Sequence, residues 1–127
     1  MLLNLTLAQI ARRLAGANLV WLAQQTITGA NGDPNNATDP TTAGFDVTDV
    51  LFGVYRIGPP AGVSVDYRVW YQWTGKSGEW DLVDGSDRSG VDVRTTQELK
   101  LGGVDRVYIE RTDASGSDWT AEIGEKQ

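Results

Sequence analysis

Residues 65–83, VDYRVWYQWTGKSGEWDLV, decide the fold of this chain. From Val65 to Trp73, valine and aromatic side chains occupy every second position, with Asp, Arg, Trp and Gln between them. This period of two is typical of a β-strand that turns one face toward a core. The next five residues, TGKSG, suit a short connection, and residues 79–83 then return as a partner strand. The sequence therefore predicts an antiparallel hairpin.

Further strands are expected on both sides of this hairpin. Residues 50–57, VLFGVYRI, are apolar nearly throughout, which predicts a strand that is covered on both faces. Shorter alternating stretches predict strands at 91–95, 104–111 and 119–123. We therefore expect a mainly β chain, an antiparallel β-sandwich or jelly-roll-like domain of about seven strands.

The N-terminal segment has a different period. Its apolar residues are spaced four and three apart, as on one face of a helix: Leu3, Leu7, Ile10, Leu14, Ala17 and Trp21. Gly16 weakens a helix by about 1 kcal/mol relative to alanine, so the helix alternatively ends near residue 15 and leaves 19–28 extended. The helix either packs on its own domain or joins copies of the chain. The candidate interface residues are Leu3, Leu7, Ile10, Leu14 and Trp21.

A stretch of turn-forming residues follows this segment. Residues 29–44, GANGDPNNATDPTTAG, contain no large apolar side chain and cannot build a core. We therefore predict three parts: a helical or extended assembly segment (1–28), a linker or arm rich in Gly, Asn, Asp and Pro (29–44), and the β-sandwich domain (45–127).

The composition excludes several kinds of site. The 127 residues include no His and no Cys, so the chain cannot form a thiolate nucleophile, an imidazole base or a cysteine zinc site. The formal charge of −6 opposes binding to phosphate backbones. No stretch approaches the roughly 20 apolar residues of a membrane-spanning helix. We expect no enzymatic activity, no cofactor, no metal, and neither a nucleic acid nor a membrane as partner.

Three aromatic residues are candidates for an exposed binding patch: Trp70, Tyr108 and Trp80. Trp70 lies between the apolar positions of its strand, and Tyr108 lies between Val107 and Ile109, so both rings belong to the polar faces of their strands. Exposed rings of this kind stack on sugars or are buried by a partner protein. The alternative is that a second sheet or the N-terminal helix of the same chain covers them. Between the two ligands, we favour a protein over a glycan.

The hairpin VDYRVWYQWTGKSGEWDLV (65–83), together with LGGVDRVYIER (101–111), resembles the small β-sandwich proteins of tailed bacteriophage virions. These include capsid decoration (cement) proteins and head-fibre or tail accessory proteins. The resemblance implies a non-enzymatic virion structural protein, a homo-oligomer and often a trimer, that docks on a capsid or tail lattice. The galactose-binding-like sandwich of carbohydrate-binding modules is similar to the same stretch. The alternative function is therefore recognition of a glycan on the host surface.

Overall fold

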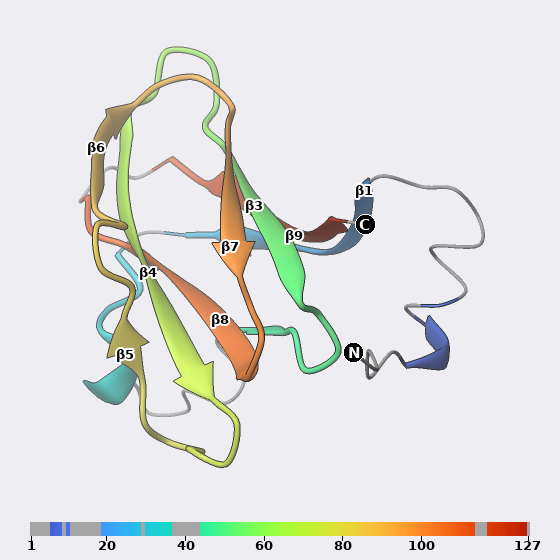
Figure 1. Ribbon diagram of the computed structural model, residues 1–127. Helices are drawn as coiled ribbons and strands as arrows, with labels where there is room; N and C mark the ends of the chain where they lie inside the picture. The colour runs from blue at the N-terminus through green and yellow to red at the C-terminus, as the bar shows by residue number, and fades with distance from the viewer. Residues whose placement is uncertain are drawn as a thin grey trace.

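Two antiparallel sheets pack face to face in the computed structural model of the chain (Figure 1), which confirms the expected β-sandwich. The structure describes residues 6–8, 10, 19–28, 30–36, 44–113 and 117–126. These residues form a single turn of 3-10 helix, Pro34–Asn36, and nine strands: β1 (Leu19–Ile27), β2 (Phe45–Asp46), β3 (Phe52–Gly58), β4 (Val65–Trp73), β5 (Asp81–Leu82), β6 (Arg88–Val91), β7 (Thr95–Lys100), β8 (Val104–Arg111) and β9 (Trp119–Lys126).

The first sheet has the strand order β1-β9-β3-β7, and the second has the order β2-β8-β4-β5, with β6 also paired to β4. Every pair is antiparallel. Alternate side chains of both sheets fill the space between them, as the period of two requires. The largest fully buried apolar side chains there are Trp119, Tyr67, Ile57, Leu101, Ile109 and Ile123.

The predicted hairpin is present. Strand β4 pairs with β5 so that Trp70 lies opposite Leu82 and Tyr71 lies opposite Asp81. The connection turns through Gly75 and Gly78, whose φ angles of 77° and 83° lie in the left-handed region that only glycine adopts without strain. Side chains of β4 are buried on both faces, since Val69 is 0% exposed and its neighbour Trp70 is only 8% exposed.

The sandwich begins earlier in the chain than the predicted boundary at residue 45. Strand β1 pairs with β9 from Leu19 opposite Lys126 to Ile27 opposite Trp119, with a shift of register between Trp21 and Ala23. The extended alternative for residues 19–28 is therefore correct, and Trp21 belongs to a strand instead of a helical stripe. Before β1, the backbone N–H of Ile10 donates to the carbonyl of Thr6 at 3.0 Å, which is one helical turn. Leu3, Leu14 and Ala17, which the helix prediction also includes, lie outside the described residues.

The strand predicted at 91–95 is wrong. Strand β6 ends at Val91 in the second sheet, and β7 begins at Thr95 in the first, so residues 92–94 cross between the sheets. Strand β7, TTQELK, was not predicted because it contributes only one apolar side chain, Leu99, to the core. The strand expected at 50–57 starts at Phe52, and the consecutive residues Val54 and Tyr55 are both buried, as a strand covered on two faces requires.

Candidate functional site

The three aromatic residues proposed as an exposed patch lie together, but they are buried. Trp70 lies opposite Tyr108 in the β4–β8 pair, and the ring of Trp80 packs on that of Tyr108 with centroids 5.8 Å apart. Their exposed fractions are 8% for Trp70, 2% for Tyr108 and 3% for Trp80. The prediction of exposed rings is therefore wrong. The three residues form a second, smaller core on the outer face of the second sheet, which we call the outer aromatic cluster.

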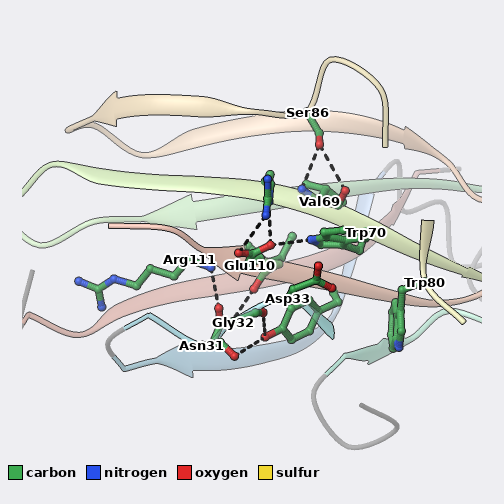
Figure 2. Close-up of polar contacts among 12 residues, drawn as sticks. Asn31, Gly32, Asp33, Val69, Trp70, Trp80, Ser86, Glu110 and Arg111 are labelled. Carbon is green, nitrogen blue, oxygen red and sulfur yellow. Dashed lines mark hydrogen bonds and ion pairs between the residues drawn. The ribbon is translucent and has the colours of Figure 1, made fainter. Parts of the chain in front are cut away.

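The covering segment comes from the stretch that was expected to be a linker (Figure 2). The hydroxyl of Tyr108 donates to the carbonyls of Asn31 and Gly32, at 3.0 and 2.9 Å. The side chain of Asn35 donates to the carbonyl of Trp80 at 3.0 Å and accepts from its N–H at 2.9 Å. Residues 31–36 are thus part of the folded domain, and hydrogen bonds of polar side chains hold them there.

Asn31 also replaces a missing strand partner at the edge of β8. Its side-chain amide donates to the carbonyl of Ile109 at 3.0 Å, and its side-chain oxygen accepts from the N–H of Arg111 at 2.7 Å (Figure 2). Backbone groups on a buried strand need such partners, because losing water without gaining a hydrogen bond is costly. One asparagine therefore satisfies two backbone groups and anchors the covering segment.

Two ion pairs support the same region. Arg68 donates to Glu110 at 2.7 Å, and Glu110 also accepts from the indole N–H of Trp70 at 2.8 Å. The hydrogen bond to Glu110 raises the pKa of Arg68 above its ordinary value. Arg111 is fully buried, pairs with Asp113 at 2.9 Å and donates to the carbonyl of Ile27 at 3.3 Å. Each charged group of these two ion pairs therefore has a partner of opposite charge, which compensates for its burial.

Trp21, the last of the proposed interface residues, lies on the outer face of the first sheet. The guanidinium of Arg56 lies 4.2 Å from the centroid of its ring and also pairs with Glu122 at 2.8 Å. Gly124 leaves room for the indole, since a Cβ there would lie 3.0 Å from Trp21 Cε3. Trp21 therefore packs on its own sheet and helps to hold β1 there. The prediction that Trp21 belongs to a helical interface is wrong.

Two other interface candidates are exposed, as that role requires. The exposed fraction is 85% for Leu7 and 37% for Ile10. Leu19 and Leu22 on β1 are 39% and 37% exposed. Ala8 and Leu22 line one hollow of about 290 Å³ with residues 46–50, which places the N-terminal turn beside β1. We call Leu7, Ile10, Leu19 and Leu22 the N-terminal apolar patch.

The chemistry that the described residues offer is limited. They include no group of three or more acidic side chains arranged to hold a metal ion. Burial raises the pKa of Tyr71 and of Tyr108 to about 12, so these hydroxyls stay neutral at pH 7. The buried hydroxyls of Tyr55 and Tyr67 share a hydrogen bond of 3.1 Å. Tyr55, Tyr67 and Tyr108 therefore act as hydrogen-bonding groups of the fold.

No helix within the described ranges has the length and apolar character needed to span a membrane. No known family model matches the sequence, and no curated protein matches it significantly.

Proposed function

We propose that this chain is a structural protein of a bacteriophage virion, a capsid decoration (cement) or accessory protein that docks on the particle through its N-terminal apolar patch. The observation that carries the proposal is the position of exposed apolar side chains. Eight large hydrophobic residues are exposed among those described, and four of them, the patch itself, lie within residues 7–22. Ala8 and Leu22 line one hollow, so the N-terminal turn lies beside β1. Apolar residues exposed side by side favour a protein–protein contact over chance exposure.

The physical driving force would be burial of this patch. Removal of apolar surface from water contributes about 25 cal/mol per Å². A helix as short as the N-terminal segment is marginal in water by itself and gains stability only by packing. Docking would therefore stabilise the turn at Thr6–Ile10 and bury the apolar side chains of the patch in one step.

The charge of the chain supports a protein partner. A net charge of −6 favours approach to a basic protein surface and opposes approach to nucleic acid. A lattice of capsid or tail subunits with a basic outer rim is a partner of this kind.

The rival function, glycan recognition, loses its main support. Sugar stacking needs exposed rings, whereas Trp70, Trp80 and Tyr108 are at most 8% exposed, and residues 31–36 are bound to Tyr108 and Trp80. A glycan could reach these rings only if the covering segment were released.

The test is binding to virions that lack the protein. We expect the purified chain to co-sediment with particles from a phage deleted for its gene, and the double variant Leu7→Ser/Ile10→Ser to bind at least tenfold more weakly. The matched control is Leu82→Ser, which removes an exposed leucine (42%) on β5 and should bind like the parent. Absence of the chain from purified virions by mass spectrometry, or equal binding of the double variant and the parent, would overturn the proposal.

A further inference from the structure

Asn31 is followed by Gly32, and this is the only asparagine–glycine pair in the sequence. The other asparagines precede leucine, asparagine or alanine. An asparagine side chain can react with the backbone nitrogen of the next residue, and a following glycine allows this most readily, because it has no Cβ and its backbone angles are the least restricted. Gly32 is exposed and has a φ angle of 81°. The most reactive asparagine of the chain is therefore the one that anchors the covering segment.

We propose that Asn31 is a site of spontaneous deamidation, with water as the co-reactant, and that the acidic product releases residues 31–36 from the outer aromatic cluster. The modification changes the chain itself and needs no other protein. The inference rests on the hydrogen bonds of the covering segment and not on the proposed virion function.

The reaction has two steps, and its atoms balance. First, the backbone nitrogen of Gly32 bonds to Cγ of Asn31, the bond from Cγ to Nδ2 breaks, and the amide leaves as ammonia with the proton of the Gly32 nitrogen. Water then opens the resulting cyclic imide at one of its two carbonyls. Opening at Cγ gives aspartate, and opening at the main-chain carbonyl gives isoaspartate, in which the main chain runs through the former side chain. The net change is one water consumed and one ammonia released.

The folded state restrains the first step. The side-chain nitrogen of Asn31 donates to the carbonyl of Ile109 at 3.0 Å, and its side-chain oxygen accepts from the N–H of Arg111 at 2.7 Å (Figure 2). The side chain must leave both partners before Cγ can reach the nitrogen of Gly32. When a reaction requires such a local opening, its rate follows the population of the open state. The rate of deamidation therefore depends on how firmly the covering segment is held.

The products cannot restore the whole anchor. A carboxylate has no N–H to donate to the carbonyl of Ile109, so two oxygen acceptors would face each other there. The N–H of Arg111 can still donate to aspartate, which keeps part of the anchor in that product. Isoaspartate also lengthens the main chain by one methylene, which displaces the carbonyls of residues 31 and 32 that accept from the hydroxyl of Tyr108. The modified segment therefore binds more weakly, and the aromatic rings become accessible to solvent.

The first test is the rate of deamidation when the full-length chain is aged at mildly alkaline pH. Peptide mapping by mass spectrometry should find conversion of Asn31, with isoaspartate among the products. The variant Asn35→Ala removes two hydrogen bonds to the backbone of Trp80 and should convert Asn31 about tenfold faster, because losing these bonds favours the open state by about that factor. The matched control Gln24→Ala, at an exposed position of β1, should convert at the parent's rate.

The second test is the state of the modified chain, which anion exchange separates by its added negative charge. Acrylamide should quench its tryptophan fluorescence more strongly than that of the fresh chain, while the circular dichroism of the sandwich is retained. The control Ser64→Asp adds a negative charge at an exposed position before β4 and should be quenched like the fresh parent. Failure of Asn31 to convert, equal rates in Asn35→Ala and the parent, equal quenching of the modified and fresh chains, or loss of the β-sheet signal would each overturn the inference.

Discussion

Replacement of Asn31 by alanine should destabilise the whole sandwich, although the residue lies in a stretch that looks like a linker. The side chain of Asn31 donates to the carbonyl of Ile109 and accepts from the N–H of Arg111, a residue with a fully buried side chain. Alanine removes both partners without allowing water to replace them freely. The perturbation therefore acts on β8, in the middle of the second sheet.

The magnitude follows from these two groups. Loss of the partner of a buried polar group costs about 1–3 kcal/mol, and two groups are affected here. Because Asn31 itself is only partly buried, the lower half of that range applies to each. We expect the free energy of unfolding to fall by about 2–4 kcal/mol in total.

The assay is urea unfolding followed by tryptophan fluorescence, because Asn35 of the covering segment binds the backbone of Trp80. The matched control is Gln24→Ala, which removes an exposed amide side chain from β1 and should change stability by less than about 0.5 kcal/mol. If Asn31→Ala were no more destabilising than Gln24→Ala, the covering segment would not be part of the folded unit and our account of the outer aromatic cluster would be incorrect.

Three further predictions test other parts of the fold. Arg111→Met should lower the free energy of unfolding by about 3 kcal/mol or more in urea, because it leaves a carboxylate without its buried cation; a loss under 1 kcal/mol would contradict this. Gly44→Ala should lower the melting temperature, because its Cβ would lie 2.8 Å from the carbonyl oxygen of Val107, whereas Gly102→Ala meets nothing within 4 Å and should not; equal melting temperatures would refute the reasoning. The pKa values of Tyr71 and Tyr108, near 12 when folded and 10 when unfolded, mean that the folded state holds these protons more tightly, so their contribution to stability is complete below pH 10 and is lost as the pH rises toward 12. Urea midpoints that stay constant across this interval, with ultraviolet absorbance showing ionisation of tyrosine near pH 10 in the folded protein, would contradict it.

The sequence predicts the strands whose alternation of apolar and polar residues arises only from facing the core between the two sheets. From Val65 to Trp73, valine and aromatic residues occupy every second position of β4, because that face lies mostly against the opposite sheet. The β4–β5 hairpin follows from the glycines at 75 and 78, since the turn requires their left-handed backbone. Local sequence and local structure coincide in this region, so the fold class could be predicted.

The burial of the outer aromatic cluster could not be predicted from its own strands. Trp70 and Tyr108 occupy the polar faces of β4 and β8, and the segment that covers them is built from Asn, Gly, Asp and Pro. Its attachment uses backbone carbonyls and asparagine amides, which leave no hydrophobic pattern. The one available signal was the presence of large aromatic residues on both faces of β4, which indicates a strand that is covered twice.

Strand β7 shows the opposite case. Its sequence, TTQELK, is polar because the strand lies at a sheet edge, and only Leu99 is buried. Pairing with β3 depends on residues some forty positions earlier, so the strand is fixed by tertiary contacts instead of its own propensity.

The central claim is that the N-terminal segment joins this chain to other protein subunits, and the molar mass in solution tests it most directly. The comparison is between the full chain and a variant without residues 1–18, which stops short of β1 because β1 pairs with β9. We predict a defined oligomer for the full chain and fewer copies per particle for the truncated one, with unchanged circular dichroism. The same number of copies per particle for both chains would contradict the claim.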